Sequence, residues 1–550
     1  MPRSPLQRTA LLAAALLAPL PAAPADYDVV LANGRVVDGT GAPWFRADVG
    51  IRGPRIGAIG DLSKATAVRR IDVAGKMVAP GFIDMLGQSE VALLIDSRIE
   101  SKVRQGFTTE ITGEGGTLAP LDAAVVRDLQ PFLDRFHLVV DWTDFAGYAK
   151  RFERSGSTLN VASFVGATRV RQVVLGFGDV QPTAEQLAEM EALTDRALAQ
   201  GAVGLSSALI YPPATWARTE ELIALAKVAA RRGGVYATHI RDEADDEMAA
   251  LDEAIRIGRE ARIPVEIWHL KVSGRNNWGR MKDVVARIAK ARAQGVDVSA
   301  NVYPYAAAAN GLAYNVPAWA QSGGTEAMLE RLGDPEARAR IKAELWHGGL
   351  GEETPEGILL LYSPAAAVEP YLGRRLSAVA QELGRSPEDA LLDLLVLSRG
   401  KLGVVRFVMS EEDVQLALRQ PWVSIGSDAP GQALDGPFGA ERAHPRAFGS
   451  APRLLGHYAR ELGLFSQEEA VRKLTSLPAR RMGLWDRGLL RPGLAADVTV
   501  FDAEKVRDVA TYEAPLAYSE GVAYVVVNGK IVLDGGRLTA ERPGRFLARR

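Results

Sequence analysis

Short apolar runs alternate with longer amphipathic stretches through the middle of the chain. Thr183-Ala184-Glu185-Gln186 has the form of a capping box and opens an amphipathic stretch that ends at Gly201. An apolar run follows at residues 202–206, then a helix-like stretch at 220–232 and another apolar run at 235–239. Short buried strands separated by helices of this length are typical of β–α units on a parallel sheet.

Eight apolar runs have this character, which is the number that a (β/α)₈ TIM barrel of the α/β class needs. A further possible strand at 406–409 leaves the count of eight open. The long stretch at about 310–420 is predicted as an insertion between strands seven and eight. The eight predicted strands are residues 81–85, 107–112, 161–165, 202–206, 235–239, 264–269, 296–303 and 422–427.

The two ends of the chain are rich in short β-like runs instead. Asn528-Gly529 lies between two such runs and is a good hairpin signal. We therefore predict one small β-sandwich domain built from residues 26–79 and 482–545, with the barrel domain at 80–481 between them.

The first 25 residues have the features of a secretory signal. Arg3 and Arg8 precede an apolar run at 9–20, and small residues follow up to Ala25. The apolar run is too short to span a bilayer. We expect residues 1–25 to be removed and the protein to be exported, with the periplasm as its destination.

Composition narrows the chemistry that this chain can perform. Of 550 residues, 47% are hydrophobic and 24% are charged, as in ordinary globular proteins. The net charge of −2 provides no field that would attract nucleic acid or an anionic membrane, so neither is expected as a partner. The absence of cysteine excludes disulfides, thiolate metal sites and cysteine nucleophiles.

Two of the six histidines, His239 and His269, end successive predicted strands. Strand ends meet at the rim of a barrel, and adjacent strands lie about 5 Å apart. Glu114 follows the second strand and Asp428 ends the last one. Two histidines and a carboxylate favour a catalytic divalent metal, zinc first. Such an ion activates water and polarises a carbonyl, while a nearby carboxylate can move the proton to a leaving nitrogen. The alternative is structural: hydrogen-bonded histidines, an ordinary loop at Glu114 and a helix N-cap at Asp428.

Several short motifs are shared with a known family. Together they resemble the amidohydrolase superfamily and, within it, the D-aminoacylase (N-acyl-D-amino-acid deacylase) family, from about Tyr27 to the C-terminus. The resemblance implies a metal-bearing TIM barrel with a β-sandwich made from both ends. The motifs are Val78-Ala79-Pro80-Gly81-Phe82-Ile83-Asp84, Thr238-His239-Ile240-Arg241, His269-Leu270-Lys271, Tyr303-Pro304-Tyr305, Ser427-Asp428, His444-Pro445-Arg446, Thr475-Ser476-Leu477-Pro478-Ala479-Arg480 and Arg491-Pro492-Gly493-Leu494-Ala495-Ala496-Asp497.

The resemblance also implies roles for individual residues. His239 and His269 would hold the metal, and Asp428 would be the general base. A substrate carboxylate would be bound by Lys271, Tyr303 and Arg446, of which the guanidinium can pair with a carboxylate in a bidentate manner.

The chain departs from the family pattern at the first two strands. The family's His-x-His falls at Leu86-Gly87-Gln88, and its cysteine ligand falls at Gly115. Leucine cannot ligate a metal, and an amide is a poor zinc ligand. Glu114, one position before the missing cysteine, is the replacement carboxylate. We therefore predict one ion, Zn²⁺, held by Glu114, His239 and His269.

These observations predict an exported, metal-dependent hydrolase of a linear amide. Its substrate would be an N-acyl amino acid, D by family resemblance, or a related peptide-like molecule. One alternative, motivated by the missing histidine pair, is a barrel that binds such a ligand without cleaving it. Another is a metal-dependent dipeptidase or cyclic amidase. The acyl group, the amino acid and the oligomeric state are left open.

Overall fold

The computed structural model describes residues 25–346 and 353–549. The predicted secretory signal, except for its last residue, lies outside these ranges. Within them, every helix is too short or too polar to cross a membrane.

Eight parallel strands form a closed barrel, which confirms the predicted fold class. Hydrogen bonds join its two sheets, from Val203 N to Ser163 O (3.0 Å) and from Met85 N to Ile425 O (2.9 Å). Each of the eight predicted apolar runs overlaps one of these strands. They are β6 (Phe82–Asp84), β7 (Phe107–Thr112), β8 (Asn160–Ser163) continued by β9 (Val165–Gly166), β10 (Gly204–Ala208), β11 (Val235–His239), β12 (Val265–Ile267), β13 (Val298–Val302) and β17 (Val423–Ile425).

Helices surround the barrel and bury its outer surface. The capping box at Thr183 and Gln186 is present and opens α6, as the sequence predicts. Apolar side chains of the helices, such as Leu251 and Val284, pack with Val265 of the barrel in one large core. The surrounding helices are α1 (Ala92–Ile95), α2 (Glu100–Val103), α3 (Ala123–Arg135), α4 (Phe145–Ser155), α5 (Ala167–Leu175), α6 (Ala184–Ala199), α7 (Thr219–Arg231), α8 (Glu247–Ala261), α9 (Met281–Ala293), α15 (Glu411–Leu418), α16 (Arg446–Arg453), α17 (Gln467–Leu474) and α18 (Ser476–Met482).

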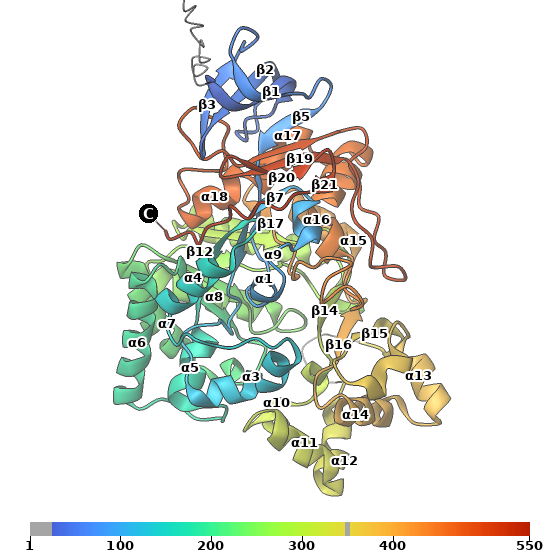
Figure 1. Ribbon diagram of the computed structural model, residues 1–550. Coiled ribbons are helices and arrows are strands. Elements are labelled where there is room, and N and C mark those ends of the chain that lie inside the picture. Colours follow the sequence, from blue (N-terminus) through green and yellow to red (C-terminus); the bar gives the residue numbers. More distant parts are fainter. Residues whose placement is uncertain (1–24, 347–352, 550) are drawn as a thin grey trace, which may run out of the picture.

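The two ends of the chain meet in one nine-stranded sheet. Its central junction is the antiparallel pairing of β5 with β18, in which Val78 lies opposite Val500. Figure 1 shows the blue N-terminal and red C-terminal strands at the same end of the molecule. The Asn528-Gly529 hairpin is confirmed, with a positive φ at both residues. The strands are β1 (Tyr27–Val36), β2 (Phe45–Arg52), β3 (Arg55–Gly60), β4 (Ala67–Asp72), β5 (Met77–Pro80), β18 (Val498–Phe501), β19 (Val522–Val527), β20 (Lys530–Asp534) and β21 (Arg537–Leu538).

A separate unit lies between β13 and β17 and projects from the barrel, in yellow in Figure 1. It has its own hydrophobic core, which includes Leu312, Ile358 and Leu391. The further possible strand at 406–409 is not part of the barrel: Arg406 ends β16, which pairs antiparallel with β14 and β15, and residues 407–409 lie outside the strand. The elements of this unit are β14 (Ala308–Gly311), α10 (Ala318–Gln321), α11 (Thr325–Gly333), α12 (Pro335–Glu344), β15 (Ile358–Tyr362), α13 (Leu376–Leu383), α14 (Pro387–Leu397) and β16 (Gly403–Arg406).

Candidate metal centre and active site

Two of the predicted site residues adopt a backbone conformation that L-residues rarely use. The φ angle is +37° at His269 and +49° at Asp428. Strain of this kind costs on the order of 1–3 kcal/mol and persists only where the surroundings enforce it. Here the backbone N–H of His269 donates to Asn301 Oδ1 (3.0 Å), and that of Asp428 donates to Leu86 O (2.8 Å). Neighbouring strands of the barrel therefore hold both residues in place.

Glu114, His239 and His269 converge on one point at the rim. Glu114 Oε1 lies 3.0 Å from His239 Nδ1 and 3.0 Å from His269 Nε2. One potential ligand atom of each residue lies within 4.8 Å of those of the other two. Within the described ranges, these three side chains are the group close enough to share a metal ion. The arrangement offers two imidazole nitrogens and a carboxylate oxygen to a single ion.

The loop after β7 is built to present Glu114. A Cβ atom at Gly115 would lie 2.8 Å from the Ala208 Cβ, and the φ angle there is +65°. A side chain at position 115 would therefore be both crowded and strained. Burial opposes ionisation of Glu114, but the hydrogen bonds and charge of His239 and His269 outweigh it and hold the carboxyl pKa well below its usual range.

Glu243 lies behind both histidines, and our sequence analysis missed it. Its Oε1 lies 3.1 Å from His269 Nδ1, 3.6 Å from His239 Nε2 and 2.5 Å from Lys271 Nζ. Burial raises its pKa, but His239, Lys271 and His269 together lower it below the usual range of a glutamate. A carboxylate behind a ligating imidazole fixes the orientation of the ring. The available signal was its position, four residues after His239 and two residues beyond the Thr238-His239-Ile240-Arg241 motif.

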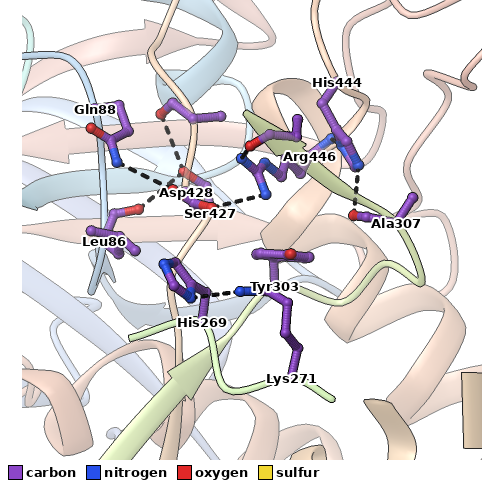
Figure 2. Close-up of polar contacts among 12 residues, drawn as sticks. Leu86, Gln88, His269, Lys271, Tyr303, Ala307, Ser427, Asp428, His444 and Arg446 are labelled. Atoms are coloured by element: carbon purple, nitrogen blue, oxygen red, sulfur yellow. Dashed lines mark hydrogen bonds and ion pairs between the residues drawn. The ribbon is translucent and has the colours of Figure 1, made fainter. Parts of the chain in front are cut away.

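Gln88 occupies the place of the second histidine of the family motif. Its side-chain nitrogen donates to Glu114 Oε2 (2.5 Å) and to Asp428 Oδ1 (3.2 Å). Figure 2 shows this amide reaching toward Asp428 from the β6 side of the site. Sequence reasoning identified Gln88 only as a poor metal ligand, whereas the structure makes it the hydrogen-bond link between two functional carboxylates.

Arg446 forms the cationic end of the site together with Lys271. Arg446 Nη1 pairs with Asp428 Oδ2 (2.9 Å), and its guanidinium carbon lies 4.5 Å from the centre of the Tyr303 ring. Lys271 Nζ lies 5.7 Å from the centre of the same ring. Figure 2 shows Lys271, Tyr303 and Arg446 next to one another. Among the residues that the structure describes, Arg446 Nε is buried without a hydrogen-bond partner. Unpartnered buried donors are costly, which favours an anionic group in the cavity beside them.

Two residues next to this end have supporting roles. His444 accepts a hydrogen bond from the Arg446 backbone (3.0 Å) and contacts Ala307 O through Nε2 (3.0 Å), so it positions the start of α16. Burial and the charge of Arg446 lower the pKa of His444 well below its usual value. Tyr305 donates to Asp508 (3.3 Å), so of these two neighbouring tyrosines Tyr303 is the one that lines the cavity.

A cavity of about 260 Å³, called the reaction cavity below, brings the predicted residues together. Gln88, Glu243 and the segment 308–311 of the inserted unit also line it. The seven residues predicted from the sequence all lie in its wall: Glu114, His239, His269, Lys271, Tyr303, Asp428 and Arg446.

Three comparisons relate the chain to known proteins. A sequence model of the Amidohydrolase family matches residues 363–533. The D-aminoacylase of Alcaligenes xylosoxydans xylosoxydans is 39% identical over 95% of this chain and 98% of its own length. A D-aminoacylase structure, described by its one-metal activation and second-metal attenuation at a binuclear centre, has a TM-score of 0.80 and 39% identity over 95% and 100% of the two chains.

A second solved structure is an N-acyl-D-glutamate deacylase from Bordetella bronchiseptica, complexed with zinc and a phosphonate mimic of the tetrahedral intermediate. It is 32% identical, with a TM-score of 0.80 over 95% of this chain and 100% of that one. Similarity of this extent covers both the barrel and the terminal sheet. The chain therefore belongs to the D-aminoacylase family of amidohydrolases.

Proposed function

We propose that the protein hydrolyses N-acyl-D-amino acids with a single zinc ion and acts outside the inner membrane. One observation carries the proposal: a metal-binding triad and a cationic carboxylate site share the reaction cavity. An N-acyl amino acid has a carboxylate close to its amide, so one molecule can occupy both ends. The D preference rests on the similarity to D-aminoacylase and N-acyl-D-glutamate deacylase.

The residues present fit one metal ion. Glu114, His239 and His269 supply the donor types that catalytic zinc sites use, with room left for a water or substrate ligand. The similarity to a deacylase complexed with zinc supports the same metal here. When bound, such an ion activates water and polarises the carbonyl that is attacked.

A second metal ion does not fit the residues present. The relatives include an enzyme with a binuclear centre, but this chain has Leu86, Gln88 and Gly115 where the family pattern has ligands. The amide nitrogen of Gln88 already lies between Glu114 and Asp428 as a hydrogen-bond donor. A neutral donor thus links the two carboxylates that a second cation would otherwise neutralise.

The cationic end would bind and orient the substrate. Arg446 offers a buried Nε donor without a partner, and Lys271 adds positive charge beside Tyr303. A carboxylate held between them would fix the amide near the triad. Fixing reactants in a productive geometry supplies a large part of enzymatic rate acceleration.

Asp428 is suited to proton transfer at the scissile amide. Gln88 and Arg446 hold its carboxylate from two sides, so it faces the reaction cavity. From there it can accept a proton from water and deliver it to the departing nitrogen. Without that proton the amine is a poor leaving group, so Asp428 acts on both halves of the reaction.

Export is proposed from the basic and apolar N-terminal pattern alone. Expression of the full chain should yield a mature protein in the periplasmic fraction, with an N-terminal sequence that begins at Asp26. An uncleaved protein in the cytoplasm would contradict this part of the proposal.

The central experiment combines elemental analysis with a substrate panel. The purified protein should contain one equivalent of zinc and release methionine from N-acetyl-D-methionine at least ten times faster than from the L enantiomer. A dipeptide and a cyclic amide serve as controls for the alternative bond types. Zinc-loaded protein that cleaves no member of the panel would refute the proposed function.

A further inference from the structure

A second cavity of about 380 Å³ adjoins the reaction cavity. The two share Gln88, Ala309, Asp428 and Arg446 in their walls. Its size lies within the range of small-molecule pockets. Because Asp428 belongs to both walls, a group attached to the scissile amide can reach this second cavity.

The wall of the second cavity is predominantly apolar. Val91 comes from the start of α1, Phe132 from α3, Leu361 from β15, and Ala429 and Phe438 from the segment after β17. Leu361 and Phe438 are each 9% exposed and Ala429 is 4% exposed. Separate elements of the barrel and of the inserted unit thus enclose one apolar space, which favours an apolar occupant.

Most polar side chains in this wall already have protein partners, and Arg442 Nε and Arg446 Nε are buried donors without a hydrogen-bond partner. Glu441 pairs with Arg135 (2.5 Å), and Arg442 donates to the backbone oxygen of Glu513 (2.9 Å). The Gln432 amide donates to the backbone oxygens of Phe438 and Glu441 (3.3 Å each). The partnered polar groups are held by the protein itself, which leaves the apolar side chains as most of the surface that an occupant would contact.

The position of the cavity indicates which arm of the substrate enters it. Of the three residues that would hold the carboxylate, Lys271 and Tyr303 line the reaction cavity but not the second one, whereas Arg446 lines both cavities, as Gln88 and Asp428 do. Asp428 flanks the bond to be cleaved, and the acyl chain begins at the carbonyl of that bond.

We infer that the second cavity is an acyl pocket that takes an extended apolar acyl group. The inference rests on the proposed function and names its substrate class as amino acids acylated with chains longer than acetyl. Each methylene transferred from water to an apolar pocket contributes roughly a fourfold gain in kcat/KM at most. The activity should therefore rise along an acyl series until the pocket is full.

The test uses acetyl, butanoyl, hexanoyl and octanoyl derivatives of D-methionine with the zinc-loaded full-length protein. We expect kcat/KM for the hexanoyl substrate to exceed that for the acetyl substrate by at least tenfold. Calorimetry with octanoate and acetate gives a second readout that needs no turnover, and octanoate should bind at least tenfold more tightly.

Two variants test whether the preference for long acyl chains arises in the second cavity. Val91→Trp should fill the pocket and lower the hexanoyl-to-acetyl ratio at least fivefold. Leu361→Lys should raise the ratio of N-succinyl to N-butanoyl hydrolysis at least tenfold, because it places a cation where the succinyl carboxylate would end. Ile210→Ala is the matched control, since Ile210 lines the reaction cavity and should leave the hexanoyl-to-acetyl ratio unchanged.

Three results would overturn or separate the claims. A flat acyl series in a protein that hydrolyses the acetyl substrate would refute the acyl pocket and leave the proposed function intact. If Val91→Trp instead changed discrimination among amino acid side chains, the pocket would belong to the side chain and the inference would be wrong. If no acyl derivative were cleaved and octanoate did not bind, both would fail.

Discussion

Buried carboxylates on the two sides of the barrel rim are stabilised in different ways. On the β11–β12 side, His239 and His269 face Glu114 in front and Glu243 behind. On the β6–β7 side, positions 86–88 carry leucine, glycine and glutamine. The first side supplies two imidazole ligands, whereas the second supplies Glu114 and is otherwise a network of hydrogen bonds.

On the β6–β7 side, a buried lysine pairs with the carboxylates of the strands themselves. Lys102 Nζ lies 2.6 Å from Asp84 Oδ2, 3.1 Å from Glu110 Oε1 and 2.5 Å from Ser427 Oγ, with its side chain fully buried. A Cβ atom at residue 87 would lie 1.9 Å from Glu110 Oε1, so glycine is required there. Lys102 thus offsets part of the buried negative charge of this side, and the two histidine ligands for an ion lie on the other side.

The largest effect is expected on the ligand-bearing side. His239→Ala should abolish binding of the ion and lower kcat/KM at least about 1,000-fold, because ion-stabilised charge is worth several kcal/mol. Elemental analysis and steady-state kinetics measure the two effects. His457→Ala is the control, since His457 lies at the surface in a pair with Glu461. A His239→Ala protein with a full equivalent of zinc would contradict the assignment.

Asp428 lies between the two sides, and its substitution should lower catalysis without changing metal binding. Asp428→Asn keeps the shape of the side chain but cannot accept the proton, so kcat should fall on the order of 100- to 10,000-fold. The metal content should remain at one equivalent. Undiminished kcat would remove Asp428 from the mechanism, and loss of the ion would make it a ligand instead.

Lys102 tests the internal neutralisation of the other side. Lys102→Met leaves Asp84 and Glu110 buried without their cation, and the free energy of unfolding should fall by about 3–5 kcal/mol. Urea denaturation monitored by fluorescence measures the change. Lys505→Met, which breaks an exposed pair with Asp502, should cost less than about 1 kcal/mol. Equal losses of unfolding free energy in the two variants would contradict a stabilising role for the buried Lys102 ion pairs.

Gln88 should give the smallest change. Gln88→Ala removes the donor between Glu114 and Asp428, each of which then loses one hydrogen bond worth about 1–2 kcal/mol. We expect kcat/KM to fall about tenfold with one equivalent of zinc retained. Titration with excess zinc is the decisive measurement, because uptake of a second equivalent would show that Gln88 itself excludes an ion.

The sequence alone determined the positions of the barrel strands and showed that the candidate catalytic residues lie at their carboxyl ends. Apolar runs of strand length between amphipathic helices require a β–α repeat, and this local pattern located all eight barrel strands. Because parallel strands all end at the same rim, His239, His269 and Asp428 were predicted to converge from their positions alone. Closure of the barrel is the only tertiary assumption that this step needs.

Only the tertiary structure decided how these side chains are supported and what surrounds them. Gln88 contacts Asp428 across 340 positions of the chain, and Leu361 of the inserted unit faces the same cavity as Val91. Such partners share no local periodicity, since they depend on how distant loops pack once the barrel has closed. Hydrogen-bond direction and cavity shape arise at that last level, where a sequence pattern carries no signal.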